Sequence, residues 1–335
     1  MVNSSKYKIV LALIIPIILS LSMNKSETKS QWGFFGHKRI NRIATFTLPP
    51  EMFGFYKEHI EFLTEHAVDP DKRRYAVEGE AQRHYIDIDH YVKHGEDPFD
   101  IMPKNWNDAI DKFTEDTLQA YGIVPWHIKV MKLKLQRAFE QKNIDLILKY
   151  SADIGHYIGD AHVPLHTTEN YNGQLTNQKG IHGLWESRLV EINYENYDYF
   201  VGKANYVKDV QSYIWDAVKG SHYALDSVLR IELEVTADFS PDRKYSFERR
   251  GNSTISVYSY EFSQEYHRRM NGMVERRLRD AISAVGSIWY TAWVDAGQPN
   301  LSEIQNTPPS AALLEEMKQL ENQFHSGEHK GRICD

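Results

Sequence analysis

From residue 32 onward, apolar side chains recur at intervals of three and four positions, which is the pattern of amphipathic helices. The pattern predicts helices at about 36–47, 51–66, 106–121, 126–141, 143–162, 182–194, 206–230, 263–295 and 311–324. Pro49, Pro125 and Pro164 mark breaks between them. Only residues 231–260 suggest a hairpin or a few strands. We therefore expect an all-α fold, a multi-helix bundle with a small irregular or hairpin insertion.

The first thirty-one residues have a different pattern. Lys6 and Lys8 precede an apolar run at 9–22, and a polar stretch follows. A basic start before an apolar run too short for a comfortable membrane span is typical of a secretory signal. We expect 1–31 to be a signal peptide and linker, and the protein to be periplasmic or secreted, with an uncleaved anchor as the alternative. The remainder divides into a main domain at 32–307 and a C-terminal helix and tail at 308–335.

Charge and cysteine content narrow the classes of function. Residues 1–31 carry four Lys and one Glu, so the rest of the chain has a net charge of −10 rather than −7. Such an acidic body argues against nucleic-acid binding through a broad basic surface, although bound metal ions change the sign locally. The single cysteine, Cys334, excludes an intrachain disulfide, so stability depends on the core and on any bound metal.

Two pairs of potential metal ligands stand four residues apart. His156 and Asp160 share one face of a predicted helix, and His182 and Glu186 repeat that spacing beyond an Asn- and Gly-rich loop. His166 follows the helix break at Pro164. Imidazole and carboxylate together favour a borderline divalent ion such as zinc. These residues predict a site for metal-assisted hydrolysis.

Four residues further upstream complete the candidate set: Trp32, His37, Asp69 and His84. Taken alone they are weaker candidates. Asp69, for example, precedes a proline, and an Asp in that position often serves only a turn.

In the order and spacing of these nine residues, the chain resembles the zinc-dependent phospholipase C superfamily. That superfamily includes the single-strand-specific zinc nucleases of the S1/P1 type from fungi and plants. The matching pieces are Trp32 with His37 five residues on, Asp69 with His84 fifteen on, His156, Asp160 and His166, and His182 with Glu186. The resemblance extends from residue 32 to about 299 and implies a helical bundle that binds up to three zinc ions.

The resemblance also implies a role for each residue. It assigns Asp69, His84, His156 and Asp160 to the first ion, and His166, His182 and Glu186 to the second. The third ion would be held by His37, a bridging Asp160, and the amine and carbonyl of Trp32. We further expect Asp69 to orient or deprotonate the nucleophile, and Asp87 and His162 to orient ligands.

Two departures from the family pattern bear on these assignments. The third site needs a free amine at Trp32, but Gln31 is an unusual residue to leave at a signal-peptidase cut. The nucleases also place an Arg three residues after the first-site Asp. Lys72 holds that position relative to Asp69, with Arg73 and Arg74 following.

Different features of the sequence favour different substrates. The His-Tyr-Ile-Asp run at 84–87 and Trp185 resemble the nucleases, whereas Glu186 in place of Asp and the lack of disulfides resemble the bacterial phospholipases. We favour phospholipid slightly, with single-stranded nucleic acid as the alternative. A non-catalytic, zinc-stabilised binding protein is the alternative of another class. No protein partner is implied, and we expect a monomer. The chain contains no His-Glu-x-x-His motif of a metalloprotease.

Overall fold

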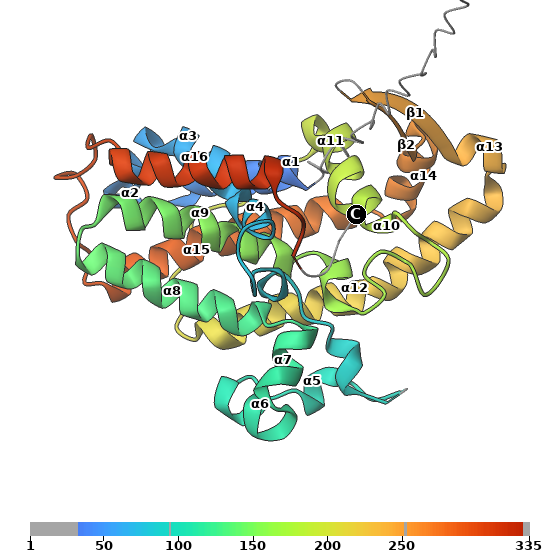
Figure 1. Ribbon diagram of the computed structural model, residues 1–335, viewed down its shortest axis with the longest axis horizontal. Helices are drawn as coiled ribbons and strands as arrows, with labels where there is room; N and C mark the ends of the chain where they lie inside the picture. Colours follow the sequence, from blue (N-terminus) through green and yellow to red (C-terminus); the bar gives the residue numbers. More distant parts are fainter. Residues whose placement is uncertain (1–32, 94, 251–252, 331–335) are drawn as a thin grey trace, which may run out of the picture.

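The structure, a computed structural model, describes residues 33–93, 95–250 and 253–330. The predicted signal peptide and linker, Trp32 and Cys334 lie outside the described residues. Two helices form the centre of the bundle, α9 (Ile144–Ala161) and α15 (Met273–Asp295), and both contact α1 (Phe34–Ala44) and α8 (Val124–Glu140). Figure 1 shows α16 along the upper side and α12 extending to the right toward a small hairpin.

The remaining elements are short or peripheral. They are α2 (Pro50–Glu58), α3 (Ile60–Glu65), α4 (Asp69–Arg73), α5 (Pro98–Ile101), α6 (Trp106–Phe113), α7 (Glu115–Tyr121), α10 (Ile181–Gly183), α11 (Leu189–Asn193), α12 (Val210–Asp238), α13 (Pro241–Lys244), β1 (Tyr245–Arg250), β2 (Ser253–Tyr258), α14 (Tyr260–Arg269) and α16 (Ala311–Ser326). The predicted all-α fold is confirmed, because the sheet of the described chain is only the antiparallel pair β1 and β2, in which Tyr245 faces Tyr258.

Helix α9 is buried on almost every side, as expected for the central helix of a bundle. The side chain of Asn143 caps its start by accepting a hydrogen bond from the Leu146 amide, and the helix ends just before Pro164. Gly155 and Gly159 let α1 approach closely. A Cβ at Gly155 would lie 1.9 Å from Asn41 Oδ1, and one at Gly159 would lie 2.8 Å from His37 Nδ1.

The predicted strand region is placed differently. Helix α12 continues to Asp238, and the strands occupy only 245–258. The sequence at 231–235 alternates like a strand, but Ile231 and Val235 extend the buried face of the helix. Glu232, fully buried between them, accepts a hydrogen bond of 2.6 Å from Gln178 and pairs with Lys244 at 2.8 Å. Tertiary contacts therefore favour a helical conformation over a strand at residues 231–235.

Two predicted long helices are interrupted. The predicted helix at 263–295 divides at Asn271 and Gly272, which have φ of 48° and 73°. The predicted helix at 106–121 divides at Thr114, with φ of 68°. A positive φ cannot be continued as a right-handed helix. Within the described residues, no helix combines the length and hydropathy of a membrane span.

Candidate metal centre

Seven of the predicted ligands lie in adjoining groups of nitrogen and oxygen atoms. Helix α1 supplies His37, α9 supplies His156 and Asp160, and His84 follows a 3₁₀ turn at Ala81–Arg83. The others come from the 3₁₀ turn Pro164–Thr167 (His166), from α10 (His182) and from the π-helical turn Leu184–Arg188 (Glu186). The fold therefore gathers residues separated by up to 149 positions.

The first group consists of His84, His156 and Asp160, and Asp71 lies beside it, in contact range of His37 and His156. Nδ1 of His84 lies 3.0 Å from Nε2 of His156 and 3.0 Å from Oδ2 of Asp160. His156 Nε2 is 3.3 Å from that same carboxylate oxygen. Asp71 Oδ1 is 3.6 Å from each of the two imidazole nitrogens. Ligand atoms at the corners of a tetrahedron around zinc lie about 3.3 Å apart. The atoms of His84, His156 and Asp160 are therefore spaced as ligands of one ion, and Asp71 Oδ1 lies slightly farther from both imidazoles.

The second group consists of His166, His182 and Glu186. The Nε2 atoms of the two histidines are 3.1 Å apart. Oε2 of Glu186 lies 2.6 Å from the His182 nitrogen and 3.4 Å from the His166 nitrogen. Three protein ligands are the usual complement of a catalytic zinc ion, which keeps a further position open.

A third group joins the other two. His37 Nε2 lies 3.4 Å from Asp160 Oδ1 and 3.3 Å from Glu186 Oε1. Asp160 thus presents one oxygen to the first group and the other to the third, and Glu186 does the same between the second and third. The two carboxylates fix the relative positions of all three groups.

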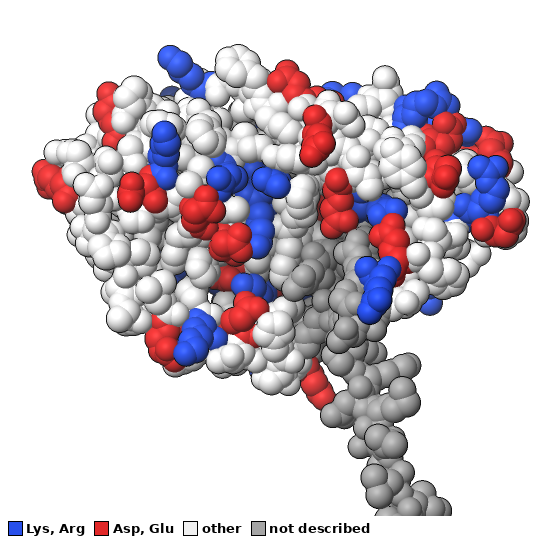
Figure 2. Space-filling model, turned by 90° about the horizontal axis from the view of Figure 1, so that it is seen from above, with Lys and Arg blue, Asp and Glu red and all other residues white. Residues whose placement is uncertain are grey.

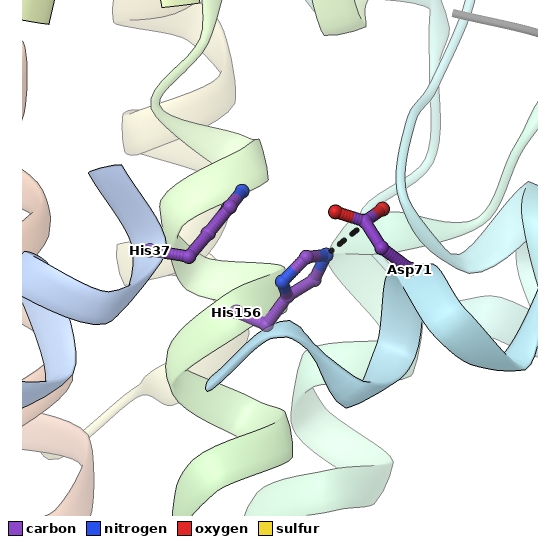
Figure 3. A group of neighbouring side chains, drawn as sticks. All are labelled: His37, Asp71 and His156. Carbon is purple, nitrogen blue, oxygen red and sulfur yellow. Dashed lines mark ion pairs between the residues drawn. The ribbon is translucent and has the colours of Figure 1, made fainter. Parts of the chain in front are cut away.

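Asp69, predicted as a ligand and as the catalytic residue, lies in none of these groups. Its Oδ2 is 2.7 Å from His66 Nδ1, and its Oδ1 accepts a hydrogen bond of 3.1 Å from Lys72. Burial alone would raise the pKa of Asp69, but His66 and Lys72 hold that pKa below its usual value. Instead, Asp71 on the same short helix α4 points to His156, as Figure 3 shows.

The imidazoles are oriented by a second set of contacts. Nδ1 of His156 donates to the Ala67 carbonyl at 2.9 Å, and Nδ1 of His166 donates to the His84 carbonyl at 2.6 Å. In both rings the lone pair is then on Nε2, the atom that faces its group. His84 is reversed. Its Nε2 lies 3.7 Å from Oε1 of Glu80, so that Nδ1 faces the first group.

Glu80 is the centre of a buried charge network behind His84. Its carboxylate is 2.6 Å from Arg83 and 3.5 Å from Arg73, and it accepts a hydrogen bond from Tyr157. Burial would raise the pKa of Glu80, but His84 and Arg73 hold it well below its usual range. Glu80 is therefore an ionised partner for His84, and sequence reasoning did not single it out.

His162 and Asp87, the two residues expected to orient ligands, are both buried. His162 Nδ1 donates to the Ile158 carbonyl at 2.8 Å, and Arg277 donates to the backbone carbonyl of His162 at 3.0 Å. Burial lowers the pKa of His162 to about 3, so this ring is neutral. Asp87 is buried, and its backbone amide donates to the Tyr121 carbonyl at 2.7 Å.

The charges and contacts of the groups suit a bound cation. Oδ2 of Asp160 is buried without a hydrogen-bond partner, although it faces two imidazole nitrogens. Burial by itself lowers the pKa of His156, but Asp160 and Asp71 raise it well above its usual value. Burial by itself raises the pKa of Glu186, but His166, His182 and His37 hold it well below its usual range. The carboxylates thus favour positive charge at the imidazoles, and a metal ion supplies that charge in place of a proton.

Comparison with known families decides the class of the protein. A model of the family described as S1/P1 Nuclease matches residues 32–282. The chain belongs to the S1/P1 nuclease family. Members of this family are zinc-dependent hydrolases of phosphodiester bonds, so the protein is a zinc-dependent phosphodiesterase. No curated protein matches the chain.

Family membership bears on the choice between Asp69 and Asp71. The S1/P1-type nucleases place an Arg three residues after the first-site Asp, and the sequence departs from that pattern if Asp69 is taken as that residue. Arg74 stands three residues after Asp71, and its Nη1 lies 3.6 Å from Asp71 Oδ1. This Arg was the signal in the sequence that pointed to Asp71.

Proposed function

We propose that the protein hydrolyses phosphodiester bonds in single-stranded nucleic acid at a centre of up to three zinc ions. The observation that supports this proposal most directly is the sharing of Asp160 and Glu186 among three adjoining ligand groups. Ions held by shared carboxylates are close enough to act on one phosphate.

The proposed ligands differ from the sequence prediction at one position. We assign Asp71, in place of Asp69, to the first ion with His84, His156 and Asp160. His166, His182 and Glu186 hold the second ion. His37, Asp160 and Glu186 hold the third, together with the backbone of Trp32 once the chain has been cut before it. The proposed export through the signal segment at 1–31 would make that cut possible.

Zinc with an open coordination position supplies a nucleophile at neutral pH and stabilises charge on the phosphate oxygens. The chain contributes the geometry. The carbonyls of Ala67 and His84 hold His156 and His166 in the tautomer that binds metal. We propose that the charge of Glu80, 3.7 Å from His84 Nε2, favours the corresponding tautomer of His84. Asp69 pairs with Lys72 within α4, and we propose this supporting role for Asp69 instead of a direct part in catalysis.

The match to the S1/P1 nuclease family over residues 32–282 supports nucleic acid as the substrate, because the family is one of nucleases. Phospholipid, slightly favoured from the sequence, remains the second candidate, and Glu186 is the residue that favours it. However, the longer side chain has a local explanation, since its two oxygens lie 2.6 Å from His182 and 3.3 Å from His37.

Affinity for nucleic acid would come from the metal centre itself rather than from a basic surface. Figure 2 shows acidic and basic side chains interspersed on the face seen from above, without a continuous basic patch there. We therefore propose that the enzyme is a monomer and that short single-stranded segments of nucleic acid bind at its metal centre. The centre would hold them mainly by the phosphate that is cut.

The test is to incubate purified, zinc-loaded protein with single-stranded DNA, single-stranded RNA, duplex DNA and phosphatidylcholine vesicles. The matched control is Asp160→Asn, which removes the carboxylate shared by two groups. We expect cleavage of the single strands and at least a hundredfold loss in the variant. Cleavage of phosphatidylcholine alone would reverse the choice of substrate. If zinc is bound at all three groups and none of the four substrates is cleaved, the result would favour the non-catalytic binding protein.

A further inference from the structure

We propose that α16 and the residues after it, up to Lys330, brace α4 and so set the position of the Asp71 carboxylate. This inference rests on the proposed metal centre and assigns a role to a segment beyond residue 282, where the family match ends. Helix α4 has only five residues, and a helix this short is not stable by itself. Its position must come from its neighbours.

The apolar face of α16 is the first part of the brace. Leu313, Met317, Leu320 and Phe324 recur at intervals of four, three and four residues, and all are buried. The ring of Phe324 packs edge-on against Tyr75, just after α4, at 5.1 Å between centroids. It also lies 6.0 Å from the ring of Phe34, at the start of α1. One side chain thus contacts both segments that lead to the centre.

Charged groups form the second part. Lys72 Nζ lies 2.8 Å from Oε2 of Glu321 on α16 and 3.1 Å from Oδ1 of Asp69 on α4. Lys72 is largely buried, with 13% of its side chain exposed, whereas Glu321 is 43% exposed, so only the Lys72 end of this bridge is shielded from solvent. It joins α16 to the residue immediately after Asp71.

The chain beyond α16 forms the third part. The backbone amide of Lys330 donates to the Arg74 carbonyl at 2.8 Å, and its Nζ donates to the Ala76 carbonyl at 3.2 Å. The His329 ring packs edge-on against Tyr75 at 5.0 Å. The first of these contacts satisfies the carbonyl of Arg74, the residue that caps the C-terminal end of α4, where a helix leaves carbonyls without internal partners. The other two hold the residues that follow.

The other end of α16 is anchored to α9, which carries His156 and Asp160. Asp145 accepts a hydrogen bond of 2.9 Å from the Ser310 amide, and Lys149 pairs with Glu316. Helix α16 therefore links the start of α9 to α4, along the upper side of the bundle in Figure 1. On its inner side, α4 is fixed by the pair of Arg73 with Asp153, at 3.0 Å. Asp71 lies between these two supports.

The experiment measures zinc affinity in the full chain by competition with a chromophoric chelator. The test variants are Leu320→Ala combined with Phe324→Ala, and separately Glu321→Gln, which leaves the apolar face intact. The matched control is Leu314→Ala, on the exposed face of the same helix. We expect the double variant to weaken zinc at the first group by about tenfold or more, as loss of supporting contacts does elsewhere. The third group should weaken less, because Phe324 also contacts Phe34 at the start of α1, and the second group should be unchanged. Glu321→Gln should have a smaller effect in the same direction.

Repeating the double variant in an Asp71→Asn background distinguishes an effect of α16 through Asp71 from a general loss of stability. If α16 acts through Asp71, the two sets of substitutions are not additive, and the double variant weakens zinc at the first group no further. Unchanged zinc affinity in the Leu320 and Phe324 variant, with the wild type binding its full complement, would overturn the brace alone. A wild-type protein that binds no zinc would overturn the proposed function, whatever α16 does.

Discussion

Asp71 Oδ1 lies 3.6 Å from Nε2 of His156, whereas Asp69, two residues earlier, is paired with His66 and Lys72. A substitution at each position separates their roles. We expect Asp71→Asn to remove or weaken one zinc ion and to lower kcat by about a hundredfold or more, because it removes a charged ligand. Asp69→Asn should retain the full zinc content and lose less than about tenfold. Metal analysis and steady-state kinetics of the two variants check this, and the reverse order of effects would restore Asp69 as the ligand.

The carboxylate of Glu80 lies outside the first group, 3.7 Å from Nε2 of His84, where its charge favours a proton on that nitrogen. Replacing Glu80 with Gln should weaken zinc binding by about ten- to a hundredfold, the usual effect of losing such a partner. The measurement is again a competition titration, with the exposed neighbour Glu78→Gln as control. Equal affinities in the two variants would show that His84 needs no help from Glu80.

Gly159 leaves room for His37. A Cβ at this position would lie 2.8 Å from Nδ1 of His37, closer than real contacts allow. We expect Gly159→Ala to displace the imidazole and to lower occupancy of the third group, while the second group keeps its ion. Zinc stoichiometry together with a crystal structure of the variant tests this. Full occupancy with His37 in place would mean that helices α1 and α9 separate without consequence.

The pH dependence of stability should contain a contribution from His127. Burial lowers the pKa of His127 to about 3, whereas a histidine in the unfolded chain titrates near 6.5. Protonation therefore favours the unfolded state between these values, so this contribution is complete above about pH 6.5 and is lost as the pH falls toward 3. At pH 5 the loss is about 2 kcal/mol.

Urea unfolding of the metal-free protein at pH 7.5 and pH 5 measures this effect. The wild type should lose about 2 kcal/mol more than His127→Gln over that interval. His162, which has a similarly lowered pKa, is present in both proteins and cancels from the comparison. An identical pH dependence in the two proteins would contradict the argument.

Removal of zinc should lower the thermal stability. Buried carboxylates and imidazoles in the three groups are favourably placed only around positive charge. A ligand at a hundred times its dissociation constant stabilises the folded state by about 2.7 kcal/mol. We expect a chelator to lower Tm by several degrees, and added zinc to restore it. Magnesium should not restore it, because the groups contain imidazole nitrogens.

Much of the fold was predictable, because helix periodicity and proline breaks are local signals. The errors came from tertiary context. Residues 231–235 alternate like a strand, but the buried pairing of Glu232 with Gln178 and Lys244 keeps them helical. The break at Asn271 and Gly272 depends on two residues in left-handed conformation, and hydrophobic periodicity does not register such residues.

The candidate site was predictable where ligands stand four residues apart on a helix, as His156 and Asp160 do. Asp69 was predicted from its fifteen-residue spacing to His84, whereas the ligand that we propose is Asp71. Glu80 also stands four residues before His84, but a 3₁₀ turn and not a predicted helix lies between them, so the sequence prediction did not single it out.

Anomalous scattering at the zinc edge, from crystals of the zinc-loaded protein, tests the central claim most directly. The account predicts a peak about 2.0–2.3 Å from His84 Nδ1, His156 Nε2 and carboxylate oxygens of Asp71 and Asp160. It predicts a second peak between His166, His182 and Glu186, within reach of the first. A fully active crystal with no zinc between these side chains, or with zinc bound by Asp69 while Asp71 points away, would contradict it.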